Sequence, residues 1–409
     1  MPENSPRTTD EYDLFCRGKL ANPYPFFHQL RSEDPVHWSK SLNSWILTRY
    51  ADVWSALRDQ RLSASRVGVF MNQLPETMRV TLDPLGRHLS QWVSMSDPPA
   101  HTRLRRLVNK AFTPGIVEGM RGHVQEIVDN LLDGIQSKGK ADLIADFAYE
   151  LPATIISEML GVPVQDRDRF KGWAEDVMAF TGGGALALPE IAEQSQKSLF
   201  EMYGYFGGII ADRRSRPRDD LISALSRVEE QGDMLTEEEL LGICDQLLTA
   251  GHDTTRNLIG NGMLALLRNP DQLEKLRLDP SLIGIAVEEL LRFDSPLQRQ
   301  TRVALEDLSI NGRQIRRGQP VLSMLGAANR DPAQFPDPDC LDICRQDNRH
   351  LAFGSGIHFC LGAPLARLEG QIATNAILRR FPSIQLASDP VEWRPNMSVR
   401  GLKALRVTF

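Results

Sequence analysis

The spacing of apolar residues predicts helices over most of the chain. From about residue 115 to 235 the pattern is that of one helix after another, and a capping box at Thr236–Glu239 then opens a helical pattern that continues to Asn269. This helix would have roughly 33 residues and a length of about 50 Å, enough to cross the whole molecule. A further helical pattern follows Leu361 and ends before Pro382. The chain is therefore predicted to be mainly α-helical.

Strand patterns are confined to a few parts of the chain. Trp45–Thr48 reads as a strand that follows a short amphipathic helix, and the pair Asn311-Gly312 marks a two-residue hairpin turn. These signals predict a small β-rich lobe, mostly within residues 20–60 and 300–325, together with the C-terminal end. Residues 61–95 show no sustained period, which is typical of a lid or a binding loop.

The length, composition and net charge of the chain limit the classes of protein to which it can belong. With 409 residues the chain exceeds the usual size of one domain, so its length alone suggests two domains. Its 42% apolar and 24% charged residues are ordinary for a globular protein. The net charge of −6 argues against nucleic acid as a main partner.

Targeting and disulfide signals are missing from the sequence. It has no stretch of about 18 uncharged apolar residues, which a membrane span would need. Residues 1–15 lack the basic and apolar regions of a signal peptide. The cysteines are odd in number and do not form a disulfide framework; they lie at positions 16, 244, 340, 344 and 360. We therefore expect a cytoplasmic protein without a membrane partner.

The candidate chemistry centres on the segment FGSGIHFCLG, Phe353 to Gly362. Its single cysteine, Cys360, lies between glycines where a loop enters a helix, with His358 two residues before it. Free backbone amides and the positive end of the helix dipole favour a thiolate at such a position. The glycines would let the loop lie flat against a large planar group, so Cys360 is a candidate axial ligand of haem iron. The alternative is a buried cysteine that acts only as a small hydrophobic residue.

The middle of the long helix carries a polar interruption. Asp253, Thr254 and Thr255 follow Gly251 within an otherwise apolar run. A buried carboxylate is costly unless it is paired or used, which points to a function for this turn. The alternative is local, because a threonine within a helix can donate a hydrogen bond to the carbonyl four residues back, here that of Ala250.

Two pairs of polar residues share helix faces elsewhere. Glu289 and Arg292 are three residues apart, and His101 and Arg105 are four apart in a basic helix predicted over Asp97–Phe112. An i,i+3 ion pair is usually an exposed contact worth under about 1 kcal/mol. A basic helix face is likewise usually solvated, so neither pair implies a site by itself.

The motif Phe-Gly-x-Gly-x-His-x-Cys-x-Gly, which this chain matches at every fixed position, resembles the cysteine-ligand loop of the cytochrome P450 superfamily. Ala250-Gly251-x-Asp253-Thr254-Thr255 resembles the oxygen-binding groove of the same family, and Glu-x-x-Arg at Glu289 precedes the cysteine loop in the family's order. The resemblance implies a mainly α fold with a small β-rich lobe, the cytochrome P450 fold. It also implies one domain over residues 1–409, which overrides the suggestion from length.

The activity that this resemblance implies is that of a haem-thiolate monooxygenase with haem b as its cofactor. Two electrons from a redox partner and O2 would serve to hydroxylate or epoxidise an organic substrate. The partner would be a ferredoxin or a flavodoxin with its NAD(P)H reductase, and the outward cations of the basic helix, such as Arg103, would face an acidic donor.

The resemblance also assigns roles to individual residues. Cys360 would be the metal ligand, and Asp253 and Thr254 would supply protons and handle dioxygen. The other residues around the haem would be His101, Arg105, Ala250, Gly251, Arg302, Phe353, His358 and Gly362. A buried structural triad would consist of Glu289, Arg292 and Arg345, although the chain has Leu341 where the family commonly has phenylalanine.

The substrate pocket would include Leu247, Ala250, Leu297, Gln298 and Met397. The mixed character of the predicted pocket segments suggests a mid-sized, partly polar organic molecule, such as a secondary-metabolite intermediate.

Three other functions compete with a monooxygenase. A haem-thiolate sensor of gas or redox state would have no need of the Asp253-Thr254 pair. A peroxide-driven enzyme would be expected to lack that pair. A zinc site could use Cys340, Cys344, His350, His358 and Cys360, but the paired two-residue spacings of structural zinc sites are absent from the sequence.

Overall fold

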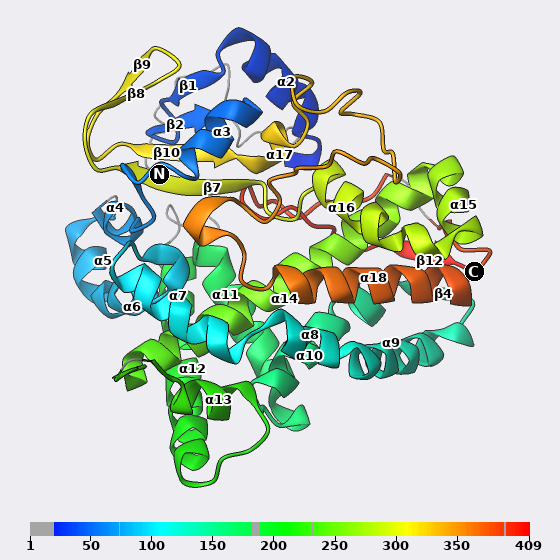
Figure 1. Cartoon of the computed structure of the whole chain (residues 1–409), viewed down its shortest axis with the longest axis horizontal. Helices are drawn as coiled ribbons and strands as arrows, with labels where there is room; N and C mark the ends of the chain where they lie inside the picture. Colours follow the sequence, from blue (N-terminus) through cyan, green and yellow to red (C-terminus); the bar gives the residue numbers. More distant parts are fainter. Residues whose placement is uncertain (1–19, 73, 182–188, 231, 388–389) are drawn as a thin grey trace, which may run out of the picture.

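A β-rich lobe lies against a larger body of helices (Figure 1). The computed structural model describes residues 20–72, 74–181, 189–230, 232–387 and 390–409. A mainly α fold with a small β lobe agrees with the prediction from the sequence. No helix in these ranges is both long and apolar enough to cross a membrane.

The main sheet joins strands from distant parts of the chain. Its five strands lie in the order β1 (Val36–Ser39), β2 (Ser44–Leu47), β10 (Pro320–Met324), β7 (Arg299–Ala304) and β3 (Leu62–Ser63). β10 runs parallel to β2, with Leu322 opposite Ile46, and every other pairing is antiparallel. Most of this sheet lies within the predicted lobe, because β1 and β2 fall within residues 20–60 and β7 and β10 almost entirely within residues 300–325, whereas β3 lies outside these bounds.

Three smaller sheets complete the β-structure of the described residues. One sheet consists of β11 (Gln385–Leu386), β12 (Arg406–Thr408) and β4 (Lys140–Asp142). The second pairs β5 (Glu229–Glu230) with β6 (Asp233–Met234). The third is the predicted hairpin of β8 (Leu308–Ile310) and β9 (Arg313–Ile315), whose turn residues Asn311 and Gly312 have φ of 48° and 78°. Positive φ at both positions is what the Asn-Gly turn requires.

In the first half of the chain the described helices before residue 100 have at most 10 residues, and the longest ones follow it. They are α2 (Tyr24–Glu33), α3 (Tyr50–Ala56), α4 (Val67–Asn72), α5 (Glu76–Thr81), α6 (Asp83–Leu89), α7 (Ala100–Ala111), α8 (Pro114–Gly119), α9 (Arg121–Gln136), α10 (Glu150–Met159) and α11 (Arg167–Thr181). The second half contains α12 (Pro189–Ser215), α13 (Leu221–Arg227), α14 (Glu237–Arg268), α15 (Pro270–Leu278), α16 (Ile283–Phe293), α17 (Leu325–Ala328) and α18 (Ala363–Arg380).

The long helix α14 crosses the middle of the molecule beside α18 (Figure 1). It begins with the predicted capping box, in which Thr236 Oγ1 accepts from the Glu239 amide at 3.2 Å. In return, Glu239 Oε2 accepts from the Thr236 amide at 2.8 Å. Most of its 32 residues are buried, and its apolar side chains join the largest hydrophobic core. α14 thus forms a rigid axis from which polar side chains can be placed within the protein interior.

Two segments differ from a plain reading of the sequence. Residues 61–95, predicted as irregular, form β3 and the three short helices α4–α6. The charge run at residues 213–220 reads as a solvated connection, but Arg213 is only 5% exposed and forms an ion pair with Asp220. Its guanidinium also donates to the Gly161 carbonyl at 3.1 Å, which explains why this arginine is buried.

Candidate functional site

The cysteine loop is a tight turn, and two of its glycines are required there for steric reasons. The Cys360 amide donates to the Phe353 carbonyl at 3.0 Å, and this bond closes the loop. Gly354 and Gly356 have φ of 72° and 71°, in the left-handed region that favours glycine. A Cβ on Gly354 would also lie 2.9 Å from Gln300 Nε2. The loop therefore approaches its surroundings more closely than other residues would allow.

The Cys360 thiol has a raised pKa, contrary to the prediction from its position before a helix. Burial is the main cause of the rise. The amides of Gly362 and Ala363 and the guanidinium of Arg105 oppose it, as the helix-end argument requires, but they do not outweigh it. A metal cation bound at the sulfur would lower the pKa of the thiol, since a thiol that coordinates a metal loses its proton.

Cys360 faces a cavity of about 280 Å³ between its loop and the central helix α14. Most of the predicted site residues line it: Arg105, Leu247, Ala250, Gly251, Thr254, Leu297, Phe353, His358, Cys360 and Gly362. The exposed lining is mainly apolar, and a Cβ on Gly251 would lie 3.4 Å from Ile156 Cγ1, which is itself in the wall. The cavity thus brings together residues that are about 250 positions apart in the chain.

Buried basic side chains gather beside His358 at one end of this cavity. The rings of His101 and His358 lie 4.2 Å apart between centroids. Burial, together with the positive field of Arg302 and its neighbours, lowers the pKa of His358 to about 3. Burial lowers the pKa of Arg302 to about 10 and that of Arg66 to about 9, and Arg302 and Arg299 add to the effect on Arg66.

This basic cluster is suited to a group that carries two negative charges. Both ring nitrogens of His101 are buried without a hydrogen-bond partner among the described residues. Arg302 donates to Thr301 O at 3.0 Å and to Gln300 Oε1 at 3.1 Å, and Arg66 donates to backbone carbonyls; none of these acceptors is charged. A carboxylate placed here would relieve the mutual repulsion of the cluster. No pattern in the sequence indicates that Arg66 is a member of this cluster.

Thr254 and Asp253 point to different surroundings. Thr254 lines the cavity, and its hydroxyl donates to the Ala250 carbonyl at 2.9 Å, the local bond that the sequence left open. Because its proton is engaged, the Thr254 oxygen is free to accept a hydrogen bond from within the cavity. Asp253 is 5% exposed and is held by Arg256 and by Arg394, whose Nη1 lies 2.7 Å from Asp253 Oδ1. Arg394 is itself 30% exposed and connects this carboxylate to the surface.

Glu369 on α18 is a site residue that the sequence analysis missed. It lines the cavity, is 2% exposed, and its Oε2 atom has no hydrogen-bond partner among the described residues. Burial raises its pKa well above the ordinary value of a glutamate. Burial therefore favours the protonated, uncharged form of this carboxyl inside the cavity.

We expect Glu369→Gln to stabilise the fold increasingly as the pH rises. A carboxyl with a raised folded-state pKa contributes stability at acid pH and loses it above the unfolded pKa of about 4.3, at up to about 1.4 kcal/mol per pH unit. Glutamine has no such titration. Unfolding free energies of the variant and the parent, measured at about pH 5 and about pH 8, should diverge with pH. A constant difference would contradict the buried neutral acid.

The structure brings together the three residues of the predicted triad. Arg292 Nε and Nη2 each lie 2.7 Å from a Glu289 oxygen, and both side chains are 0% exposed. Arg345 Nε lies 3.3 and 3.2 Å from the two Glu289 oxygens. Leu341, the departure from the family pattern, is buried and does not prevent this geometry.

Other predicted residues lie elsewhere. Gln298 and Met397 line a separate small hollow beside Arg394 and Arg400, so their placement does not support substrate contact. Arg103 was expected to face outward as a free cation, but it binds Asp233 at 2.7 and 2.8 Å and Glu239 at 2.5 Å. Within the described ranges no group of three or more His, Cys, Asp or Glu side chains could hold a metal ion, which removes the zinc alternative there.

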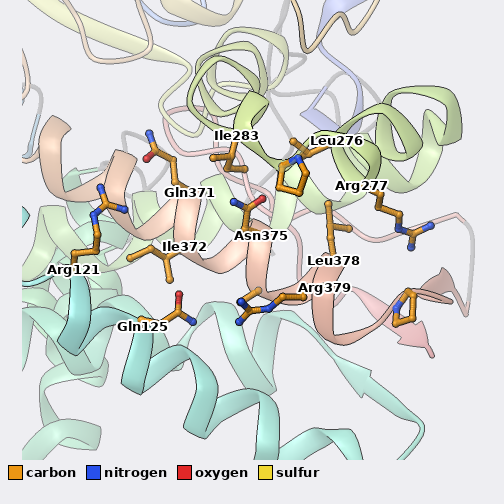
Figure 2. Close-up of a pocket in the computed structure, with 13 residues that line it drawn as sticks. Arg121, Gln125, Leu276, Arg277, Ile283, Gln371, Ile372, Asn375, Leu378 and Arg379 are labelled. Atoms are coloured by element: carbon orange, nitrogen blue, oxygen red, sulfur yellow. The ribbon is translucent and has the colours of Figure 1, made fainter.

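A larger hollow of about 480 Å³ lies between α9, α15 and α18 (Figure 2). Its lining combines aliphatic side chains with amides and arginines: Arg121, Gln125, Leu276, Arg277, Ile283, Gln371, Ile372, Asn375, Leu378 and Arg379. None of these is a thiol, a carboxylate or an imidazole. This hollow is the larger of the two, but its lining lacks such reactive groups. The cavity at Cys360 is therefore the candidate site.

Comparisons with known proteins show what the chain as a whole is similar to. The family model described as cytochrome P450 matches residues 187–279 and 282–400. The polyketide biosynthesis cytochrome P450 PksS of Bacillus subtilis is 41% identical, with 95% of this chain and 96% of that protein covered. The cytochrome P450 monooxygenase PikC of Streptomyces venezuelae is 43% identical, with 97% and 94% covered. A crystal structure of P450BioI with a fatty-acyl carrier protein superposes with a TM-score of 0.90 at 40% identity, covering 96% and 99%.

Proposed function

This chain belongs to the cytochrome P450 family, and from that premise we propose that the Cys360 sulfur is the axial ligand of its haem iron. The protein is a monooxygenase that carries haem b and uses O2, two electrons from a redox partner and a small organic substrate. When bound, the haem supplies the oxygen activation that a thiolate donor favours. The observation that carries the ligand assignment is the cavity that Cys360 shares with α14. The reduced protein should bind carbon monoxide with the red-shifted absorption band of sulfur ligation, and its absence would refute the assignment.

The basic cluster would hold the two haem propionates. His101 and Arg302 are buried donors, His358 is half-buried, and Arg66 would add a fourth basic side chain to the same end of the cavity. Arg105 lines the cavity nearer to Cys360. Charge-assisted hydrogen bonds to carboxylates are the strongest that such donors make. Ala250, Gly251, Phe353 and Gly362 would form the apolar walls against the ring.

Thr254 and Asp253 would manage the protons of the reaction. The Thr254 oxygen, whose own proton is donated to Ala250, would accept from a water and keep it in place within the cavity. Asp253 would take protons from solvent on the side of Arg394 and release them inward after leaving its arginine partners. Glu369 on α18 could hold a second proton, because burial raises the pKa of its carboxyl and so favours the protonated form.

We expect Thr254→Ala to retain haem and oxygen binding while electrons are diverted from product to peroxide. Loss of a positioned proton-transfer group typically costs about 10²–10⁴-fold in rate. The measurement is product formed per NAD(P)H consumed, with a substrate found by screening metabolites for the low- to high-spin shift. Thr249→Ala, on the same helix but outside the cavity lining, is the matched control. Unchanged coupling in Thr254→Ala would remove the proton-handling role.

The electron donor would be a ferredoxin or a flavodoxin with its NAD(P)H reductase, and the enzyme would act in the cytoplasm. Two large apolar side chains of the cysteine loop, Ile357 and Phe359, are 50% and 40% exposed beside Cys360. Exposed apolar groups next to a redox centre suit a transient protein partner. Arg106 on α7 is 42% exposed, although Asp233 lies 4.0 Å away, and it would add attraction for an acidic donor.

The substrate would be a mid-sized, partly polar secondary-metabolite intermediate. The cavity wall is mainly apolar, with polar groups at Gln246, Thr255 and Gln300 that could orient a few oxygen atoms. PksS is named for polyketide biosynthesis, which agrees with this class. The structure of P450BioI contains a carrier protein with its acyl chain, so carrier-bound molecules should be screened beside free ones.

A further inference from the structure

A buried imidazole–carboxylate pair joins α6 to the central helix outside the residues assigned above. His88 on α6 is 7% exposed and Asp245 on α14 is 0% exposed, and His88 Nε2 is in direct contact with Asp245 Oδ2. Burial raises the pKa of Asp245, and His88 opposes the rise. A carboxylate at such a depth is costly without its partner, so the pair fixes the distance between α6 and α14.

The chain that follows His88 forms one wall of the cavity. Trp92, Val93 and Ser94, which we call the wall segment, line the cavity directly after α6. The turn between α6 and the wall segment packs against α14 at Gly242, where a Cβ would lie only 2.9 Å from Gln91 Cβ. Gly242 and Asp245 are three residues apart and so lie on one face of α14. The pair and this close approach together seat the wall segment on the helix.

A third element, α12, also contacts the pair. The Tyr203 ring of α12 contacts the His88 ring edge to face, with centroids 5.0 Å apart. Gln246 and Leu247, which directly follow Asp245, line the cavity on the other side. The pair is therefore at the junction of α6, α12 and α14, one residue from the cavity lining.

We propose that His88 and Asp245 are positioning residues that hold the wall segment in place and so set how fast molecules enter and leave the cavity. This inference rests on the proposed function, because it takes the cavity to be the haem and substrate site. Removal of either partner leaves the other buried and unpaired, and α6 must then move to admit water. The wall segment would move with it, because only three residues separate His88 from Trp92.

The test follows 4-phenylimidazole, an apolar ligand of haem iron, by stopped-flow absorbance in the holoenzyme. His88→Ala and Asp245→Ala should each raise both the association and the dissociation rate constants by roughly tenfold, which corresponds to about 1.4 kcal/mol. The double variant should resemble the single ones, because the two residues act as one unit. His88→Gln retains a donor for Asp245 and should restore slow exchange.

His123→Ala is the matched control, because it removes another interhelical imidazole–carboxylate pair, with Glu158, away from the cavity. Should Asp245→Ala fail to fold, Asp245→Asn keeps the volume and is read against His88→Gln in the same way. Unchanged exchange rates, or effects that simply add in the double variant, would overturn the inference. A missing sulfur-ligated carbonyl band would instead contradict the proposed function, so the two failures are distinguishable.

Discussion

Replacement of Cys360 by alanine is expected to abolish monooxygenase activity and the red-shifted band of the reduced carbonyl complex. The sulfur faces the cavity, and alanine offers no atom that could bind iron there. The basic cluster at the other end is unchanged by the substitution, so a fraction of the protein should still take up haem through its propionates. We therefore expect a haem-containing but inactive protein rather than an unfolded one. Absorbance of the reduced carbonyl complex and product formation are the two measurements.

Two further variants sharpen this expectation. Cys360→Ser keeps the size of the side chain but supplies an oxygen donor, so it should bind haem and lose the sulfur signature. Cys340→Ala removes an exposed thiol outside the cavity and should behave like the parent. An intact red-shifted band in Cys360→Ser would show that another residue ligates the iron.

Local patterns along the chain predicted the elements that position the site. The capping box at Thr236 determined where α14 begins, and the Asn311-Gly312 turn determined the β8–β9 hairpin. The glycines around Cys360 predict a loop that can lie flat against a planar group, and two of them have positive φ. Each of these signals lies within a few residues of the feature that it predicts, which is why sequence alone carries them.

The residues that were missed act through partners distant in the chain. His88 and Asp245 are 157 positions apart, and Arg394 meets Asp253 at a separation of 141. The sequence around each of these four residues carries no signal for the contact that it makes. Burial produces the other surprises: it raises the pKa values of Cys360 and Glu369 against the expectation from local dipoles or typical exposure.

Glu289 accepts hydrogen bonds from four different residues. Besides Arg292 and Arg345, it accepts from the Asp342 amide at 3.0 Å and from Asn348 Nδ2 at 3.2 Å. Arg292 in turn donates to the carbonyls of the chain that leads to the cysteine loop, at 2.8 to 3.3 Å: those of Asn329, Pro338 and Cys340. The carboxylate therefore fixes one helix, two guanidinium groups and the entry to the loop at once.

Glu289→Ala should consequently lower the free energy of unfolding by about 3–5 kcal/mol, the usual cost of leaving a buried charge unpaired. Because Arg292 would lose its anion while it still holds the chain before the loop, haem incorporation should fall with stability. Urea unfolding and the haem-to-protein absorbance ratio measure the two effects. Glu274→Ala breaks an i,i+3 pair on α15 in which Glu274 is 57% exposed and lies 3.8 Å from Arg277, and should cost under about 1 kcal/mol. Equal losses in the two variants would mean that Glu289 is no more than an ordinary helix-surface charge.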